Sequence, residues 1–314
     1  MNLLTKIPLK KQDNNLIDYN SEILFLGSCF SENIGGKFNY FKFKNTINPF
    51  GILFHPVAIE NLILKAIEED CFSEKDVFNH NEKWHCFKVH SKLSNTSKKE
   101  LVSHLNKQKD VLALKLKTAS HIIITLGTSW VYRNTQTQDI VANCHKVPQK
   151  QFKKELLTVQ AITKSLKSIL SLISGVNKNA SVIFTVSPIR HTKDGFIENT
   201  QSKSHLITAI HQVLNKQSFY FPSFEIMMDE LRDYRFYKQD MIHPNTTAIN
   251  YIWNAFKLVW LSNHAFKMME TIETIQKGLQ HKPFNAKSQA HQRFLKNLEV
   301  KKATLQAQFS HIVF

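Results

Sequence analysis

Three short apolar runs constrain what this chain can fold into more than any other feature of its sequence. The runs are EILFLG at 22–27, HIIITLG at 121–127 and SVIFTVSP at 181–188, and a shorter one, SFYFPS, occupies 218–223. Runs of this length and composition are typical of strands that are covered on both faces. Segments with helical spacing lie between them. The order strand, helix, strand, helix, strand therefore predicts an α/β fold with a central parallel sheet covered on both faces.

The other predicted elements follow from hydrophobic periodicity and from turn-forming residues. Helices are expected from Ser31 to about Phe38 and over 57–69, 99–118, 152–173, 200–216 and 245–260, and hairpins within 71–98 and 130–147. Asn245 or Thr246 can cap the last of these helices, which closes the domain. We expect residues 1–264 to form one domain with an insertion at about 54–120.

Residues 265–314 are predicted to form a C-terminal helical extension. Met, Ile, Leu and Phe recur there at helical spacing among Lys residues, with an interruption at Lys282-Pro283-Phe284. We expect a helical pair that packs against the domain. Contact with a second subunit, which would give a homo-oligomer through these helices, and contact with a membrane surface are the alternatives.

The net charge of the chain limits the classes of partner that it is expected to bind. Among 314 residues, 41 are Lys or Arg and 25 are Asp or Glu, which gives a net charge of +16, and 42% are hydrophobic. These values exclude an acidic solvating chain and the low hydrophobicity of a disordered one. Lys supplies nearly all of the positive charge and is spread along the chain, whereas nucleic-acid-binding proteins more often cluster Arg with aromatic residues. We interpret the charge as a solvated basic surface and expect no nucleic-acid partner.

The cysteines and the N-terminus bear on compartment and metal binding. The four cysteines, at 29, 71, 86 and 144, include no CxxC pair, which favours a reducing compartment over a disulfide framework. A zinc site of Cys144, His145, Asp240 and His243 is disfavoured because two of these residues are adjacent. The N-terminus lacks the apolar core of a signal peptide, and no run of about 18 apolar residues occurs. We expect a cytoplasmic protein with no membrane span, no metal and no cofactor.

Residues that directly follow the predicted strands are the candidates for function, because ligands of open α/β sheets bind beyond the carboxyl ends of the strands. Ser28 follows the first run at a strand-to-helix turn, where backbone N–H groups and the helix dipole favour a developing oxyanion. Asp240 and His243 share one loop, where the carboxylate can hold the imidazole in the tautomer that accepts a proton. Together these residues indicate nucleophilic catalysis.

Seven sequence blocks between about Leu24 and Phe256 add to this interpretation. They are LFLGSCFSENIG, NPFGILFHP, TLGTSWVY, VANCHKVP, SPIRH, YFPSFEI and DELRDYRFYKQDMIHP. Together they resemble the GSCFA domain family, a branch of the SGNH/GDSL hydrolase superfamily. The resemblance implies a three-layer α/β/α sandwich of flavodoxin-like topology. It also implies an esterase or acyltransferase that acts through Ser, His and Asp without a metal.

The resemblance implies roles for individual residues as well. Ser28 would be the nucleophile, His243 the general base and Asp240 the carboxylate that orients it. Gly51 and Ser28 would donate backbone N–H groups to the oxyanion hole. The superfamily's third block normally supplies an Asn side chain, whereas the matching segment here is Gly127-Thr128-Ser129-Trp130. The hydroxyl of Thr128 or Ser129, or the amide of Asn143, would then replace that donor.

Further residues in or near these blocks are candidates for substrate binding. They are Asn48, His90, Trp130, His145, Arg190, His191 and Lys203. The guanidinium fork of Arg190 suits a carboxylate or phosphate, with a salt bridge as the alternative. A packing role for Trp130 and a structural role for His90 are also alternatives.

The sequence therefore predicts a hydrolase that cleaves a small-molecule acyl ester, on a carbohydrate or another alcohol, through an acyl-enzyme. Acyl transfer to a hydroxyl acceptor and a catalytically idle binding protein are the alternatives. Cys29 is the alternative nucleophile, because a thiolate beside a helix N-terminus is also nucleophilic. The family pattern selects Ser28 over Cys29.

Overall fold

A five-stranded parallel sheet lies at the centre of the computed structural model, which describes residues 5–314. Its strands lie in the order β10-β9-β5-β1-β2, and all neighbouring pairs are parallel. The strand order reverses between β1 and β5, the arrangement of a flavodoxin-like sheet. The predicted α/β fold with a central parallel sheet is thus confirmed. The bounds are β1 (Glu22–Gly27), β2 (Lys44–Ile47), β5 (His121–Leu126), β9 (Ser181–Val186) and β10 (Ser218–Tyr220).

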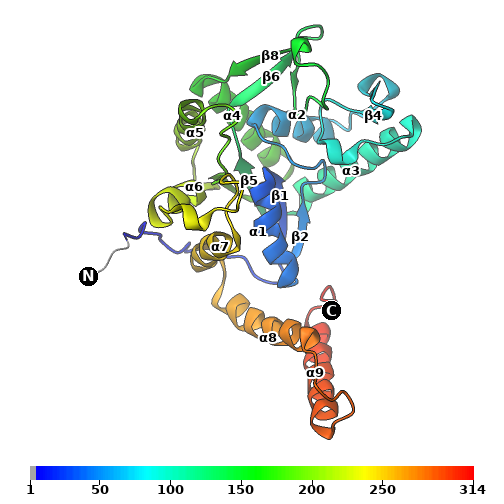
Figure 1. The fold of residues 1–314 in the computed structure, drawn as a ribbon, viewed down its shortest axis with the longest axis vertical. Helices are drawn as coiled ribbons and strands as arrows, with labels where there is room; N and C mark the ends of the chain where they lie inside the picture. Colours follow the sequence, from blue (N-terminus) through cyan, green and yellow to red (C-terminus); the bar gives the residue numbers. More distant parts are fainter. Residues whose placement is uncertain (1–4) are drawn as a thin grey trace.

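Helices cover both faces of this sheet (Figure 1). Alternate residues of a strand point to opposite faces, so Leu24 and Leu26 of β1 pack on one face and Ile23 and Phe25 on the other. Because both faces are buried, the central strands are apolar along their whole length. One face is covered by α2 (Pro56–Ile67), α3 (Lys98–Thr118), α4 (Val159–Val176) and α5 (Phe196–His211), and the other by α1 (Cys29–Tyr40) and α7 (Thr246–Trp260).

The region between β2 and β5 supplies two of these covering helices, α2 and α3. Between them lies a short antiparallel hairpin of β3 (Phe78–His80) and β4 (Lys83–His85), so the hairpin predicted within 71–98 is confirmed. Two single turns, η1 (Glu74–Asp76) and η2 (Ser91–Leu93), flank the hairpin. Much of this region therefore belongs to one layer of the fold.

A second, antiparallel sheet corrects one prediction. It consists of β6 (Trp130–Asn134), β7 (Ile140–Val141) and β8 (Phe152–Leu156). The sequence predicts a helix from 152, because Lys, Glu and Leu favour helices. Residues 152–156 instead pair with β6, where Phe152 is buried and the two lysines that follow are exposed. The helix α4 begins only at Val159, after the side chain of Thr158 caps it.

The chain ends in two helices, α8 (Asn263–Gln280) and α9 (Gln289–Gln308), that project from the sheet domain as an antiparallel pair (Figure 1). Their apolar residues extend the core of the α1 and α7 face, where the ring of Tyr19 lies 5.4 Å from that of Phe309. The remaining short elements precede α4 or α7. They are η3 (Gln149–Gln151), α6 (Ser223–Glu225), η4 (Ile226–Glu230) and η5 (Tyr234–Phe236).

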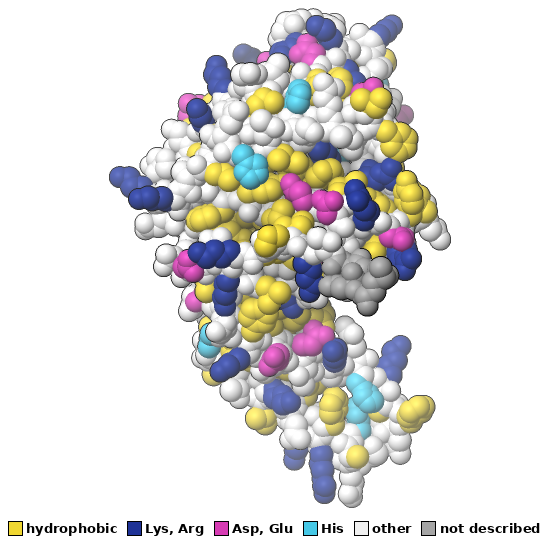
Figure 2. Space-filling view, turned by 90° about the vertical axis from the view of Figure 1, so that its left-hand side faces the viewer, with side chains coloured by type: hydrophobic (Ala, Val, Ile, Leu, Met, Phe, Trp, Pro, Cys, Tyr) yellow, Lys and Arg dark blue, Asp and Glu magenta, His cyan; other side chains and the backbone are white. Residues whose placement is uncertain are grey.

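Charged side chains are dispersed over the surface shown in Figure 2. On this face, Lys and Arg lie singly or in small groups among acidic and hydrophobic side chains rather than in one basic patch. Within residues 5–314, no helix combines the length and the apolar character that crossing a membrane requires.

Gly27 provides a test of how closely β1 approaches β5. Its φ is +129°, and a Cβ atom there would lie 2.1 Å from the carbonyl oxygen of Thr125. A Gly27→Ala variant should therefore push the two strands apart and lower the free energy of unfolding by about 3 kcal/mol or more, as measured by urea denaturation.

Gly36→Ala is the matched control, because no atom lies within 4 Å of its Cβ position and it lies within α1. That variant should gain about 0.5–1 kcal/mol, since alanine favours the helix. A Gly27→Ala protein as stable as the wild type would contradict the close approach of β1 and β5.

Candidate active site

A cleft of about 590 Å³ opens at the carboxyl ends of the central strands. Cys29 follows β1, Thr128 follows β5, and the segment 189–194 follows β9, and all of these contribute to its lining. His243 lines it from the loop before α7, and β6 and β7 add aromatic and aliphatic walls. The cleft thus occupies the position where open α/β sheets bind their ligands.

The loop after β2 ties together the strand ends beneath the cleft. The side-chain oxygen of Asn48 accepts the N–H of Gly27 at 2.9 Å, and Leu53 donates its N–H to the Gly27 carbonyl at 2.9 Å. The carbonyl of Phe54 accepts the N–H groups of both Gly127 and Thr128. Asn48, which we expected to bind substrate, therefore holds the backbone at the end of β1 and is not among the residues lining the cleft.

Asp240 and His243 form a hydrogen-bonded pair on one loop. Asp240 Oδ2 lies 2.7 Å from His243 Nδ1, and Asp240 Oδ1 accepts the backbone N–H groups of Ile242 and His243. These three hydrogen bonds lower the pKa of the Asp240 carboxyl to about 2. Asp240 is therefore charged at neutral pH and orients the imidazole so that Nε2 is free to exchange a proton.

Ser28 and Cys29 occupy different environments although they are neighbours. The side chain of Ser28 is fully buried, caps α1 by accepting the N–H of Phe30 at 3.3 Å, and is not part of the cleft lining. Cys29, the first residue of α1, is half-buried and lines the cleft together with His243. Within residues 5–314, no hydrogen bond joins His243 to Ser28 Oγ or to Cys29 Sγ.

Groups around Cys29 shift the pKa of its thiol in opposite directions. Burial raises the pKa of the thiol above its ordinary value. The backbone N–H of Cys29 and the ammonium groups of Lys203 and Lys238 lower the pKa in part. The thiol is therefore protonated at rest, and a base such as His243 is needed to make it nucleophilic.

Two of the expected oxyanion donors are already engaged. The backbone N–H of Gly51 donates to the Asn48 carbonyl at 2.8 Å, and that of Ser28 donates to the Thr125 carbonyl at 3.0 Å. The N–H of Cys29, at the first position of α1, has no partner among the described residues, as expected for the first turn of a helix. This N–H group is therefore available as a hydrogen-bond donor at the helix N-terminus.

The three side chains predicted as the third oxyanion donor also differ in whether their donor groups are already engaged. Ser129 is fully buried and its hydroxyl donates to the Ser202 carbonyl, while Thr128 Oγ1 lies 3.0 Å from Ser202 Oγ. Asn143 lines the cleft and accepts the N–H of His145 through its oxygen, which leaves its NH₂ group without a partner within residues 5–314. Of these three side chains, Asn143 is therefore the one with a free hydrogen-bond donor at the cleft.

The other candidate substrate-binding residues fall into two groups. Trp130, Arg190 and His191 line the cleft. His90 and His145 lie outside its lining: His90 caps η2, and His145 is buried with Nε2 bound to the Cys86 carbonyl at 2.7 Å. Within residues 5–314, no three His, Cys, Asp or Glu side chains are grouped so that they could hold a metal ion.

Lys203 lies beneath the cleft and joins two strands. Its ammonium group, 1% exposed, donates to the carbonyls of Gly127 and Ser187 at 2.7 Å each, and so bridges the ends of β5 and β9. Burial lowers the pKa of Lys203 to about 7. Its contacts are those of a structural bridge rather than of a substrate ligand.

His55 and Phe54 are among the cleft residues that the sequence does not predict. His55 lines the cleft and caps α2, with Nδ1 accepting the Ala58 N–H at 3.2 Å and Nε2 at 3.1 Å from the Val141 carbonyl. Phe54 packs edge-on against His191. The sequence does carry a signal for His55, because it precedes a Pro at the start of a helical pattern.

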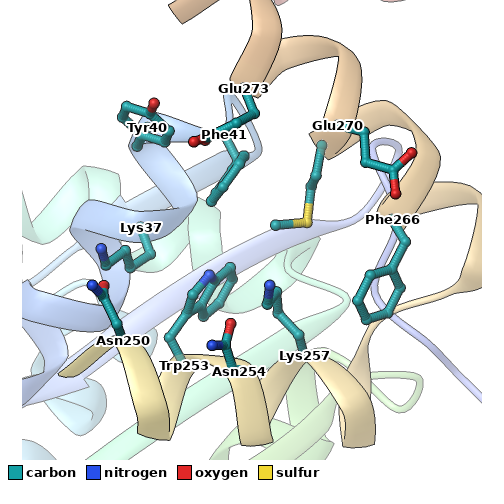
Figure 3. A pocket seen from close by; sticks show the side chains of 11 residues that line it. Lys37, Tyr40, Phe41, Asn250, Trp253, Asn254, Lys257, Phe266, Glu270 and Glu273 are labelled. Carbon is teal, nitrogen blue, oxygen red and sulfur yellow. The ribbon is translucent and has the colours of Figure 1, made fainter. Parts of the chain in front are cut away.

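A second hollow, of about 540 Å³, lies between α1, α7 and α8 (Figure 3). Lys37 from α1 and Lys257 from α7 face Glu270 and Glu273 from α8 across an aromatic floor that includes Trp253. None of the 11 described residues that line it is Ser, Cys or His. The hollow therefore lacks the pairing of a Ser or Cys with a His that the sequence predicts, and the cleft at the strand ends is the candidate active site.

The fold and the cleft define an α/β protein whose candidate active site lies beyond the carboxyl ends of a parallel sheet. Within that class, the chain belongs to the GSCFA family, whose model matches residues 22–256. The model of the GSCFA domain protein C-terminal domain matches residues 272–314, which include the second half of α8 and all of α9. No curated protein sequence matches this chain.

Three solved structures are distantly similar to this chain. They are a carbohydrate esterase family 3 protein from Talaromyces cellulolyticus (9% identity, TM-score 0.36, covering 81% of this chain and 99% of that one), a serine-to-alanine mutant of an acetyl esterase with acetate ion (10%, 0.36, 81% and 99%), and the acetyl xylan esterase Est2A from the rumen bacterium Butyrivibrio proteoclasticus (11%, 0.35, 84% and 65%).

His55 makes the stability of the protein depend on pH. Burial lowers the pKa of its imidazole to about 4, so the folded protein keeps the ring neutral where the unfolded chain protonates it. The free energy of unfolding should therefore fall as the pH drops from about 6.5 to 4, by up to about 1.4 kcal/mol per pH unit for this residue.

A His55→Asn variant tests this dependence, because Asn also caps helices but does not titrate. Urea unfolding at several pH values should give a shallower pH dependence for the variant than for the wild type. The other buried histidines contribute equally to both proteins, so identical slopes would contradict the assignment to His55.

Proposed function

We propose that this protein cleaves an acyl ester through a covalent acyl-enzyme, with Cys29 as nucleophile, His243 as general base and Asp240 as the carboxylate that orients His243. The observation that carries the proposal is the shared cleft: a thiol at a helix N-terminus and a carboxylate-bound imidazole open onto the same cavity. This constellation is the one that nucleophilic catalysis requires.

The reaction would proceed in two balanced steps. His243 Nε2 takes the proton of the Cys29 thiol, the sulfur attacks the ester carbonyl carbon, and the alcohol leaves with the proton that His243 returns. Water then gives a proton to His243 and attacks the thioester carbon, which releases the carboxylic acid and restores the thiol. Asp240 stabilises the imidazolium in both steps because its carboxylate is charged at neutral pH.

The developing oxyanion has two candidate donors. The backbone N–H of Cys29 lies at the positive end of α1, and the amide of Asn143 supplies a side-chain donor from the opposite wall. In comparable sites, one such donor lowers the activation barrier by about 2.7–4 kcal/mol. Asn143 would thereby fill the place that an Asn of the third block occupies in the superfamily.

Ser28 has a supporting role in this proposal. Its side chain caps α1 and its carbonyl accepts the N–H of Ser31 at 2.9 Å, so it fixes where the helix begins. Cys29 is consequently held at the first helical position. The same contacts argue against Ser28 as nucleophile, since its hydroxyl has no exposed surface.

Substitution of the two neighbouring residues separates the two nucleophiles. Cys29→Ala should reduce the hydrolysis of p-nitrophenyl esters by at least ~10³-fold, and His243→Ala should produce a similar loss. Ser28→Ala should retain most of the turnover while losing about 1 kcal/mol of stability, as expected for a helix cap. Iodoacetamide should label Cys29 and block turnover in proportion to labelling.

Cys71→Ala is the control for thiol reactivity, because Cys71 is exposed and does not line the cleft. This variant should keep full activity. Loss of turnover and of fluorophosphonate labelling in Ser28→Ala, with an active Cys29→Ala, would return the nucleophile to Ser28. A folded wild type that neither labels nor hydrolyses any ester would contradict ester cleavage.

A further inference from the structure

The loop that carries Asp240 and His243 is exposed, and contacts with the rest of the protein must fix its position. The side chains of Asp240 and His243 are 44% and 38% exposed. The loop closes on itself, since Lys238 donates its N–H to the His243 carbonyl at 2.8 Å and Met241 donates to the Lys238 carbonyl at 2.9 Å. Such a self-closed turn does not by itself determine how close His243 comes to the sheet.

Arg190 joins this loop to the carboxyl end of β9. Its backbone N–H donates to the Ile242 carbonyl at 3.1 Å, and its guanidinium donates to the Met241 carbonyl at 3.0 Å. A single residue thus binds two consecutive carbonyls, the second of them directly before His243. Any displacement of Arg190 would be passed on to the His243 backbone.

Three aromatic rings hold the guanidinium in place. The rings of Phe196, Tyr234 and Tyr237 lie 5.4, 5.6 and 5.3 Å from its central carbon. Phe196 begins α5, and the two tyrosines belong to or follow η5, so the cage connects both elements to the loop. Contacts of this kind favour Arg, whose flat guanidinium can stack on rings while it donates hydrogen bonds in its plane.

Met241 adopts a backbone conformation that requires such support. Its φ is +54°, which is uncommon for a residue other than Gly, Asn or Asp. Its carbonyl is the group that Arg190 binds. Strained conformations of this kind persist where surrounding contacts over-determine them, and they cluster at functional sites.

We propose that Arg190 is a positioning residue, which acts through the Met241 and Ile242 carbonyls to hold His243 at the cleft. Its guanidinium donates to a carbonyl and lies among three rings, and we assign it to positioning the loop rather than to binding the substrate carboxylate or phosphate that the sequence suggests. The kinetic consequence rests on the proposed function, whereas the structural consequence for the loop does not.

The test compares Arg190→Ala, Arg190→Lys and the control Arg232→Ala, which removes an exposed arginine from a neighbouring segment. Hydrogen exchange of the peptide that spans 238–245 should accelerate at least tenfold in Arg190→Ala and by less in Arg190→Lys, which keeps a charge among the rings. Exchange in the control should match the wild type.

Kinetics with a p-nitrophenyl ester provide the second readout. In Arg190→Ala, kcat should fall by ~10²-fold while KM changes by less than about twofold, because a misplaced base slows the chemical step and not binding. Guanidinium ion at millimolar concentration should restore part of kcat in Arg190→Ala and none in His243→Ala. A merely structural role would not respond to this rescue.

Each other outcome has a defined meaning. A raised KM with unchanged kcat and unchanged loop exchange would overturn the proposal and make Arg190 a substrate ligand. If Arg190→Ala does not fold, Arg190→Lys decides: faster exchange of 238–245 with a lower kcat and an unchanged KM would support the proposal, and a raised KM with wild-type exchange would overturn it. If the wild type cleaves no ester, the proposed function fails, and the exchange of 238–245 alone tests Arg190.

Discussion

The architecture of the cleft depends on one buried amine, that of Lys203, whose pKa burial lowers to about 7. A charged side chain that is withdrawn from water is costly unless polar groups replace the lost hydration. Here the carbonyls of Gly127 and Ser187 accept hydrogen bonds from it, and the ring of Phe224 lies 5.6 Å away. Both carbonyls mark the points where strands end and cleft walls begin. The same contacts that solvate Lys203 therefore fix the separation of the walls that follow β5 and β9.

The groups proposed for catalysis differ in how they are held. Cys29 begins a helix whose start is determined by the cap of Ser28 and by the close approach of Gly27 to β5. His243 lies on an exposed loop whose position depends on contacts with the end of β9. The site thus combines a nucleophile on a rigid element with a base on a tethered loop, and geometric precision is needed from both.

The sequence predicted the sheet because burial on both faces leaves continuous apolar runs, as in β1, β5 and β9. It also predicted the pairing of Asp240 with His243, since both residues lie on one short loop. It misassigned residues 152–156, because the pairing of β8 with β6 is a long-range contact that overrides local helix propensity.

The sequence was less informative about individual atoms. Which of two neighbours, Ser28 or Cys29, faces the cleft depends on the backbone angles at the helix cap, and these have no signature in the residue types. Likewise, the engagement of the Gly51 N–H by Asn48 follows from a turn that only the folded loop defines. The family pattern identified the family to which the chain belongs but could not assign hydrogen bonds within its blocks.

The protonated state of Cys29 has a consequence for the durability of the protein. Oxidants such as peroxide react with thiolates far faster than with thiols. Because burial raises the pKa of Cys29, the resting protein exposes little thiolate to them. A nucleophile that ionises only when a neighbouring imidazole removes its proton is one that survives between turnovers. In the proposed mechanism, the partial burial of Cys29 therefore protects its sulfur against oxidation between turnovers.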